Sequence, residues 1–493
     1  MAKKVGIIGS GFSSLSAACH LSKLGYEVHV FEKNETPGGR ARQLKASGYS
    51  FDMGPSWYWM PDVFEHFFAQ FDRKPSDYYQ LVRLDPAYRV KFNEEFVDIP
   101  GNLDQIYELF EKLETGSAKN LKRFLFQAAF KYEVGVKNLV YKPSRSIAEF
   151  MDFKLLSGML KMDVFTSMSK HVRKFFKDER LIQLMEFPVL FLGSTAEKTP
   201  ALYSLMNYAD LKLGTWYPMG GMYQVVKAME NLALELGAIF HFNTEVSGFE
   251  YKGRKATHIK DSNGQSYEVD GVVAGSDYHH TDQILLKEEY RNYTSRYWET
   301  RVMSPSSLLF YIGLDTKLQN MQHHVLFFDE DFKKHASDIY QHPQWPEKPL
   351  LYTSVTSLTD PATAPRKGEN LVVLIPVAPG LEDKEALRDK YFNLSMKRLE
   401  RFTGVPIRDH IIFKKSYAHK DFISDYHSFK GNAYGLANTL RQTAVLKPSL
   451  KNKKLDNLYY TGQLTVPGPG VPPSIISGEV VAKEINKDFA KFS

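Results

Sequence analysis

The residues best suited to chemistry lie in three glycine-containing turns near the two ends of the chain. The first turn, Gly9-Ser10-Gly11, follows a short apolar run and opens an amphipathic stretch that ends at Gly25. Glycines there let the backbone approach a pyrophosphate, which then lies at the N-terminus of the following helix. Glu32 follows about 20 residues later, at the end of the next predicted strand, where a carboxylate can hold a ribose hydroxyl. The pattern predicts a βαβ unit that binds a dinucleotide.

This turn departs from the usual pattern at one position. The third glycine or alanine, which normally allows the helix to pack closely against a strand, is replaced by Ser14. Serine is small, so the prediction of a dinucleotide site is weakened only slightly. The plain alternative for Glu32 is a solvated strand end.

The second turn distinguishes between possible dinucleotides, which the βαβ unit cannot do. Pro37-Gly38-Gly39-Arg40 comes shortly after Glu32. The glycines let the backbone pass close to a cofactor, and the arginine fork can donate to phosphate. A glycine turn with a surface arginine is the structural alternative. Gly-Gly-Arg after the acidic residue resembles the extended fingerprint of FAD-binding oxidoreductases.

The third turn lies near the C-terminus. Thr461-Gly462-Gln463 is followed by the run TVPGPGVP over residues 465–472. Together the three turns resemble the superfamily that holds amine oxidases, protoporphyrinogen oxidase and carotenoid desaturases. The last run is similar to the T-x-P-G-x-G-V-P loop of the bacterial-type carotenoid (phytoene) desaturases, and the likeness extends from Val5 to about Ala482.

The resemblance implies an α/β fold, with a Rossmann-like FAD-binding domain, an inserted α+β substrate domain and a helical subdomain. Residues 217–222, 244–246, 274–277, 433–436 and 441–443 also match the family. It implies that FAD is held by Gly9, Ser10, Gly11, Phe12, Ser13, Ser14, Glu32, Lys33, Gly39, Arg40, Ser56, Trp57, Val246, Ser276, Asp277, Gly462, Gln463, Gly470, Val471, Pro472 and Ile475.

The elements that must position these turns come from distant parts of the chain. Strands are expected at residues 4–9, 27–32, 272–275 and 457–461, with helices over 12–24, 220–236 and 384–403 and from about Ser474. Asn263-Gly264 predicts a hairpin. Residues 57–215 show mainly helical spacing. We therefore predict a discontinuous FAD-binding domain (1–75, 216–300 and 421–493), interrupted by a helical, membrane-contacting substrate part (76–215) and a substrate sheet (301–420).

A desaturase removes a hydride from one carbon and a proton from its neighbour, and the flavin takes the hydride. The resemblance places an acidic residue after Pro143, which leads to Glu149 as the tentative proton acceptor. Ser146 to Glu149 also has the S-x-x-E form of a helix capping box. Asp152 or water are further alternatives.

A carotenoid has few polar groups, so it must be positioned by an apolar channel and should enter from a membrane surface. The chain is therefore expected to be peripherally membrane-associated. Its single cysteine allows no disulfide within the chain and suits a reducing compartment, so a cytoplasmic location is expected. An acceptor such as oxygen or a quinone is expected to take the electrons. The candidate membrane contact lies in 145–190, with a helical subdomain core as the alternative. Its apolar residues are Met159, Phe165, Met168, Phe175, Phe176 and Leu190.

Composition excludes several other classes of protein. A net charge of +6 with interspersed signs gives no basic stripe for nucleic acid. No run approaches about 18 apolar residues, so no membrane span is expected. The single cysteine, Cys19, is expected to be a buried helix residue. The pairs His279-His280 and His323-His324 lack metal-ligand spacing and are expected on the surface.

Three functions remain open. The favoured one is an FAD-dependent carotenoid desaturase, acting either on phytoene or at C-3,4 of a 1-hydroxylated acyclic carotenoid. The second is an FAD-dependent amine or porphyrinogen oxidase, although the C-terminal region has no cysteine for a covalent flavin. A saturase of related chemistry is a variant of the first. The third is a non-catalytic isoprenoid-lipid carrier of the same fold.

Overall fold

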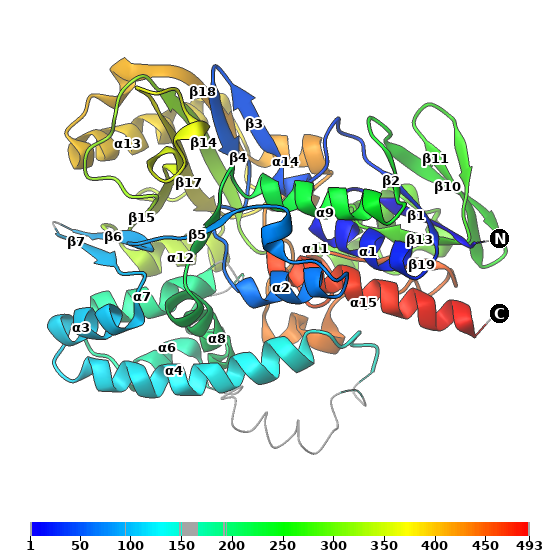
Figure 1. Ribbon diagram of the computed structural model, residues 1–493, viewed down its shortest axis with the longest axis horizontal. Coiled ribbons are helices and arrows are strands. Elements are labelled where there is room, and N and C mark those ends of the chain that lie inside the picture. The colour runs from blue at the N-terminus through cyan, green and yellow to red at the C-terminus, as the bar shows by residue number, and fades with distance from the viewer. Residues whose placement is uncertain are drawn as a thin grey trace.

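A parallel sheet assembled from distant chain segments forms one side of the molecule. The computed structural model describes residues 2–93, 95–146, 149, 166–190, 193 and 195–491. The sheet order is β19-β13-β1-β2-β9, all parallel. These strands are β1 (Lys4–Ile8), β2 (Glu27–Phe31), β9 (Ile239–His241), β13 (Gly271–Ala274) and β19 (Leu458–Tyr460). The N- and C-termini lie on this side (Figure 1).

Three long helices pack beside this sheet. They are α1 (Phe12–Lys23), α9 (Tyr223–Glu235) and α15 (Val471–Ala490), and α1 contacts both others (Figure 1). The approach of α15 to α1 depends on Gly478, where a Cβ would lie 2.2 Å from the carbonyl oxygen of Ser13. The C-terminal helix begins at Val471, three residues before the predicted start at Ser474, because prolines 472 and 473 fit its first turn.

A three-stranded antiparallel sheet extends from this lobe. It contains β10 (Val246–Lys252), β11 (Lys255–Asp261) and β12 (Ser266–Glu268). The turn between β11 and β12 holds Gly264 at φ +84°. The hairpin predicted from Asn263-Gly264 is confirmed.

A seven-stranded sheet forms the upper left of Figure 1, with the order β18-β14-β17-β16-β15-β6-β7. All pairs are antiparallel except β15 with β6. One face packs against α13 (Glu385–Thr403) through residues such as Phe310 and Val373, and the other faces the parallel-sheet lobe and the lower helices. The strands are β6 (Tyr88–Phe92), β7 (Glu95–Ile99), β14 (Ser306–Leu314), β15 (His324–Phe327), β16 (Leu351–Ser354), β17 (Glu369–Val377) and β18 (Ile411–Tyr417).

The prediction that residues 57–215 are mainly helical is wrong near the start of this range, where three strands lie. β5 (Leu81–Arg83) pairs with β8 (Trp216–Pro218), and β6 and β7 extend the seven-stranded sheet. In β6, polar Arg89 and Lys91 alternate with buried apolar residues, which is a strand pattern. The helices of this region are α2 (Pro61–Ala69), α3 (Leu103–Leu113), α4 (Ser117–Val134), α6 (Met168–Val172), α7 (Glu179–Leu190) and α8 (Leu205–Asn207).

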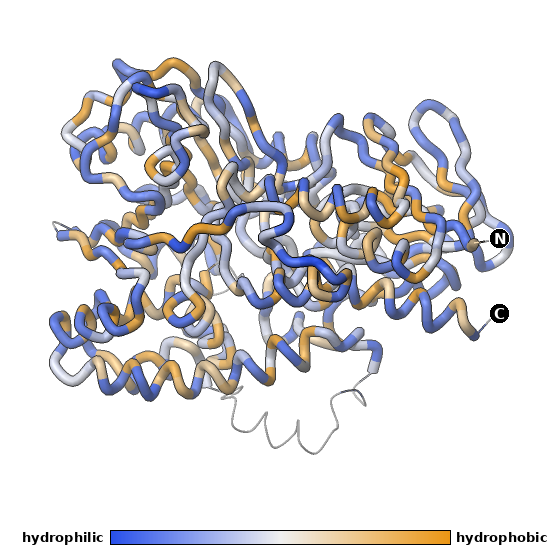
Figure 2. Tube along the Cα trace, in the orientation of Figure 1, coloured by the Kyte–Doolittle hydropathy of each residue, from blue (hydrophilic) through white to orange (hydrophobic). Residues whose placement is uncertain are grey.

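Short elements complete the structure. They are β3 (Gln43–Ala46) paired with β4 (Tyr49–Asp52), and the helices α10 (Tyr278–His280), α11 (Ser295–Glu299), α12 (Phe332–Tyr340) and α14 (His419–Tyr426). Along α3 and α4 hydrophilic and hydrophobic segments alternate (Figure 2). Among the described helices, none is both long and apolar enough to cross a bilayer.

Candidate functional site

The three glycine turns predicted from the sequence meet at the carboxyl edge of the parallel sheet. The N–H of Gly38 donates to the carbonyl of Ser10 at 2.9 Å, which joins the second turn to the first. A Cβ at Gly462 would lie 3.2 Å from the Oγ of Ser13, so the third turn reaches the start of α1. Among the described residues, no side chain caps the N-terminus of α1, whose N-cap is Gly11. Backbone N–H groups at such an end attract phosphate.

Glu32 lies at the end of β2 and organises the first turn. One carboxylate oxygen accepts from the backbone N–H of Ser10 at 2.9 Å and from its hydroxyl at 2.6 Å. The other accepts from the backbone N–H and the side-chain amide of Asn34 at 2.9 and 2.7 Å. The carboxylate is only 4% exposed and lines the cleft described below. It therefore lies where the sequence predicts a ribose-binding acid, and not at a solvated strand end.

Ser14 packs against Gly275, a contact that the sequence pattern of the turn did not predict. A Cβ at Gly275, just after β13, would lie 1.9 Å from the Oγ of Ser14. The space that the missing third glycine would provide therefore comes from the neighbouring strand, and α1 still packs closely on the sheet. Ser14 itself does not line the cleft.

Arg40 projects into the same region and faces a buried carboxylate. Its Nη2 donates to the Oγ of Ser428 at 2.8 Å, and its Nε is buried without a partner among the described residues. Burial lowers the pKa of Arg40, and the nearby Asp277 opposes that shift. Asp277 accepts from the backbone N–H of His279 and Phe429, while burial raises its pKa. Arg40 is thus a turn residue directed inward rather than a surface arginine.

A long cleft runs along these turns. Most predicted cofactor residues line it: Gly9, Ser10, Gly11, Phe12, Ser13, Glu32, Lys33, Gly39, Arg40, Val246, Ser276, Asp277, Gly462, Gln463, Gly470 and Val471. Five others lie outside the lining: Ser14, Ser56, Trp57, Pro472 and Ile475. Ile475 is 1% exposed, and its carbonyl accepts from Ser16, so it belongs to the contact between α15 and α1.

The seven-stranded sheet provides a second wall that the sequence did not reveal. Ser307 and Leu309 of β14 and Leu374 of β17 line the cleft, as do Tyr434 and residues of α14. Tyr434 lies in a segment that already resembled the family. The sheet residues could not be predicted, because all nine residues of β14 are buried and their sequence shows no alternation that identifies the inner face.

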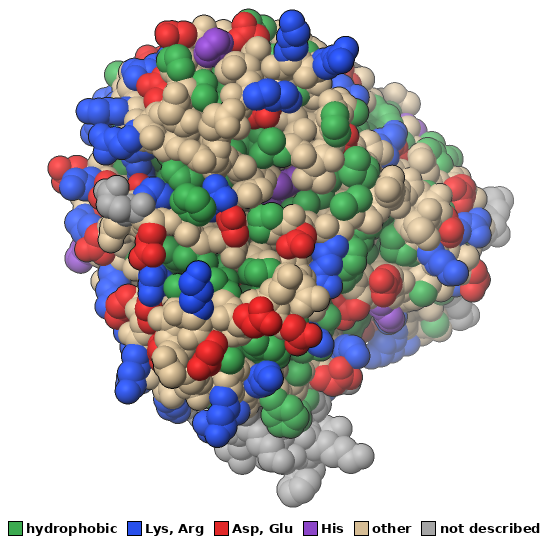
Figure 3. Space-filling model, turned by 60° about the vertical axis from the view of Figure 1, so that its left-hand side comes forward, with side chains coloured by type: hydrophobic (Ala, Val, Ile, Leu, Met, Phe, Trp, Pro, Cys, Tyr) green, Lys and Arg blue, Asp and Glu red, His purple; other side chains and the backbone are tan. Residues whose placement is uncertain are grey.

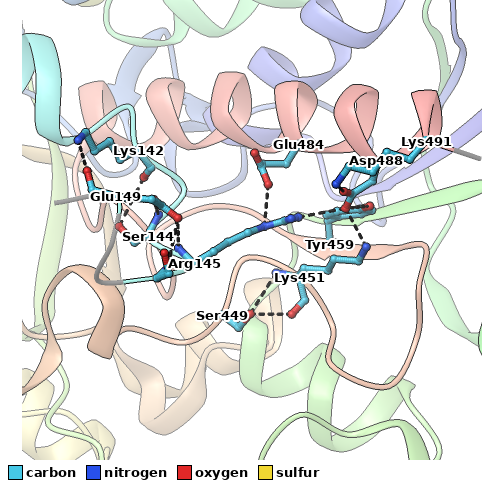
Figure 4. A network of polar contacts seen from close by, with 11 residues as sticks. Lys142, Ser144, Arg145, Glu149, Ser449, Lys451, Tyr459, Glu484, Asp488 and Lys491 are labelled. Atoms are coloured by element: carbon cyan, nitrogen blue, oxygen red, sulfur yellow. Dashed lines mark hydrogen bonds and ion pairs between the residues drawn. The ribbon is translucent and has the colours of Figure 1, made fainter. Parts of the chain in front are cut away.

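The carboxylate of Glu149 is hydrogen-bonded to the local backbone, and its catalytic role stays a prediction. Its two oxygens accept from three consecutive backbone N–H groups, those of residues 144–146, at 2.8, 2.9 and 3.1 Å. Glu149 does not line the cleft. In Figure 4 it lies beside Lys142 and Ser144, on the segment that Arg145 joins to α15. Asp152, the second acidic candidate, lies outside the residues that the structure describes.

The prediction that the two adjacent histidine pairs lie on the surface is wrong. His323 and His324 are 4% and 0% exposed, and both rings pack among aromatic side chains. His279 and His280 are half-buried, and His280 lines the cleft. Over the described ranges, no group of three or more potential ligands could hold a metal ion. Cys19 is fully buried in α1, as expected.

These observations fit FAD. The uncapped helix N-terminus, a glycine turn with Gly9 at φ +84°, and the acid at the end of β2 match the needs of a dinucleotide. The partnerless Nε of Arg40 offers a further donor. Residues of the second and third turns extend the cleft beyond the dinucleotide unit, toward the seven-stranded sheet.

Comparison with known proteins identifies the family. The family described as flavin containing amine oxidoreductase matches residues 12–486. The chain is 38% identical over 489 residues to the carotenoid 3,4-desaturase of Haloarcula japonica, covering 99% of this chain and 98% of that protein. It is 29% identical to the zeta-carotene-forming phytoene desaturase of Myxococcus xanthus, covering 98% and 94%.

A solved structure shows the same fold. An oxidoreductase from Methanosarcina mazei superposes with a TM-score of 0.63 at 17% identity, covering 97% of this chain and all of that one. At this identity the likeness concerns the fold alone. The chain belongs to the flavin-containing amine oxidoreductases, and within them to the bacterial-type carotenoid desaturases, with FAD as the cofactor.

Proposed function

We propose that this protein is an FAD-dependent carotenoid desaturase that forms a double bond at C-3,4 of an acyclic carotenoid. The observation that carries the proposal is the full-length identity of 38% to a carotenoid 3,4-desaturase, in a chain whose glycine turns meet in one cleft. Phytoene-type desaturation is the second form of the same activity, supported by the relative from Myxococcus xanthus.

The chain's own residues would bind FAD through the turns at its two ends. Glu32 would hold the ribose, the N-terminus of α1 the pyrophosphate, and residues from Gly462 to Val471 the flavin end. When bound there, the flavin would supply the hydride-accepting chemistry of the reaction. The wall formed by Leu309 and Leu374 would hold the apolar chain of the substrate and exclude water. Oxygen or a quinone would take the electrons.

The helical part would contact a membrane through one face of α4. Phe126 is 79% exposed and Phe130 is 40% exposed, and Lys119, Lys122 and Arg123 are exposed on the same side of the helix. Low on the face drawn in Figure 3, hydrophobic side chains lie among both basic and acidic ones. Aromatic residues flanked by basic ones suit an anionic lipid interface.

This assignment differs from the predicted contact in 145–190. Met168, Phe175 and Phe176 are buried in the hydrophobic core beneath α3 and α4, and Leu190 packs against that core. The core alternative is therefore correct for them. Met159 and Phe165 lie outside the residues that the structure describes.

Two measurements test the proposal. The purified protein should carry FAD, with a yellow absorption that bleaches on reduction. Cells that accumulate acyclic carotenoids should gain a pigment with one more conjugated double bond when they express the chain. A protein that binds FAD and changes none of the supplied carotenoids would refute the desaturase assignment. A protein that holds no flavin and binds isoprenoid lipid would instead be a carrier.

A further inference from the structure

A hydrogen-bonded chain of polar side chains lies at one face of the seven-stranded sheet. The Oγ of Ser56 and the Oη of Tyr352 are 2.7 Å apart, and the same Oη is 2.8 Å from the Nδ1 of His324. Tyr352 is 5% exposed and His324 is fully buried. The three residues come from the segment after β4, from β16 and from β15.

Strand register places this chain beside the cleft. Tyr352 pairs with Leu374 of β17, and Leu374 lines the cleft. Adjacent strands are about 5 Å apart, so Tyr352 lies one strand beyond the cleft wall and on the same face. His324 shares this face, because it precedes Leu326, the partner of Tyr352, by two residues. Pro55, which precedes Ser56, also lines the cleft.

The far end of the chain is a polar atom that lacks a partner. The Nε2 of His324 is buried and makes no hydrogen bond within the described part of the protein. The ring stacks on Trp57 at 4.3 Å with an interplanar angle of 12°. Buried polar atoms are nearly always hydrogen-bonded, so this atom calls for a partner beyond the residues that the structure describes.

The environment selects an uncharged partner. Burial lowers the pKa of His324 well below its usual value, and so the imidazole is neutral at physiological pH. Trp57 stacks on the His324 ring, and Tyr88 and Phe187 pack against Trp57 from other sides. A carboxylate or an ammonium group would lose its hydration there without a counter-charge. A hydroxyl group would both accept and donate.

We infer that Ser56, Tyr352 and His324 bind a hydroxyl group of the carotenoid substrate and so determine which end of it reaches the flavin. This inference rests on the proposed function. It gives Ser56 and Trp57, predicted as cofactor contacts, a place in the substrate site. A site built to hydrogen-bond a hydroxyl discriminates against the analogue that lacks it, because its own polar groups are then left unpaired.

The test compares two acyclic carotenoids that differ only by a hydroxyl group, presented in liposomes to the FAD-loaded protein. We expect the wild type to have the higher kcat/KM for the hydroxylated one. Tyr352→Phe should lower the ratio of the two kcat/KM values about tenfold, which corresponds to about 1.4 kcal/mol. Ser56→Ala, a smaller change, should lower it in the same direction.

Tyr391→Phe is the matched control, because it also removes a buried hydroxyl, one that donates to the carbonyl of Pro346 on the opposite side of the sheet. It should leave the ratio unchanged. Equal loss for both substrates in Tyr352→Phe, or a wild type without preference, would overturn the inference while the desaturase assignment stands. A binding assay that uses the shift of the carotenoid absorption band separates the inference on the hydroxyl site from the proposed desaturase function. Preferential binding of the hydroxylated compound without turnover of either would sink the proposed function alone.

Discussion

Glu149 carries two alternative predictions from the sequence, a proton-accepting role and a helix cap. Its carboxylate accepts from three backbone N–H groups, which leaves it committed to the local chain. We expect Glu149→Gln to retain flavin and turnover, because the amide oxygen can still accept, and Glu149→Ala to unfold at a lower temperature. Steady-state turnover and thermal unfolding measure this. Loss of turnover in Glu149→Gln with normal flavin content would restore the catalytic role.

Asp210 makes a pH-dependent contribution to the stability of the protein. It is 3% exposed and accepts from the hydroxyl of Tyr88 at 2.7 Å, and burial raises its pKa to about 7. The folded state therefore keeps a proton that the unfolded state loses near pH 4. Its contribution to the free energy of unfolding falls as pH rises from about 4 to 7, by up to about 1.4 kcal/mol per pH unit.

Asp210→Asn should remove this dependence, because the amide oxygen still accepts from Tyr88 and cannot ionise. From pH 5 to pH 8, the thermal unfolding temperature of the variant should rise relative to that of the wild type. Parallel pH profiles for the two proteins would show that Asp210 does not titrate in this range.

At the scale of elements, the packing of α1 on the sheet depends on Ser14 and Gly275, because the space between them leaves no room for a second side chain. Gly275→Ala would place a methyl group 1.9 Å from the Oγ of Ser14, and we expect it to cost about 1–3 kcal/mol and to weaken FAD binding. Ser14→Gly combined with Gly275→Ala should recover most of both losses. Urea unfolding and flavin content measure this. A double variant no better than Gly275→Ala would contradict the pairing.

Hydrogen bonds to Asp488 hold the C-terminal helix α15 against two other chain segments, as drawn in Figure 4. Asp488 accepts from Arg145, Lys451 and Tyr459 at 3.1, 2.7 and 2.9 Å. Those hydrogen bonds hold its pKa below the usual range, against the opposing effect of burial. A lowered pKa contributes stability above about pH 4, and this stability is lost as pH falls toward the folded value.

Asp488→Asn should therefore lower the free energy of unfolding by about 1–3 kcal/mol at pH 7, and by less at pH 3. The exposed Asp389, 3.9 Å from Lys414, provides a control, and Asp389→Asn should cost well under about 1 kcal/mol. Urea unfolding at both pH values measures this. An equal loss at both would mean that charge on Asp488 contributes nothing.

At the scale of the whole molecule, the face of α4 is the proposed contact with lipid. Replacing both Phe126 and Phe130 with serine should reduce binding to anionic liposomes about tenfold or more, because two rings no longer enter the interface. Ile412→Ser, which removes an exposed apolar residue from β18, should have no effect. Flotation with liposomes checks this. Unchanged flotation of the double variant would move the contact elsewhere.

Local chemistry accounts for what could be predicted from the sequence. Gly9, Gly39 and Gly264 lie at positive φ in turns, and Glu32 follows a strand, so neighbours within a few residues suffice to specify them. The alternation of polar and apolar residues in β6 could have indicated a strand, but its partner β15 lies more than 200 residues away. No local pattern reports such a partner.

The sequence by itself determined the dinucleotide turn, the flavin fingerprint and the family resemblance, since each depends on residue types at short spacing. Only the tertiary structure decided which side chains face the cleft. It paired Ser14 with Gly275, buried His324 beside Tyr352 and committed Glu149 to the backbone. The physical reason is that strand register and helix packing between distant segments determine the direction of each side chain, and these contacts leave no mark at short spacing.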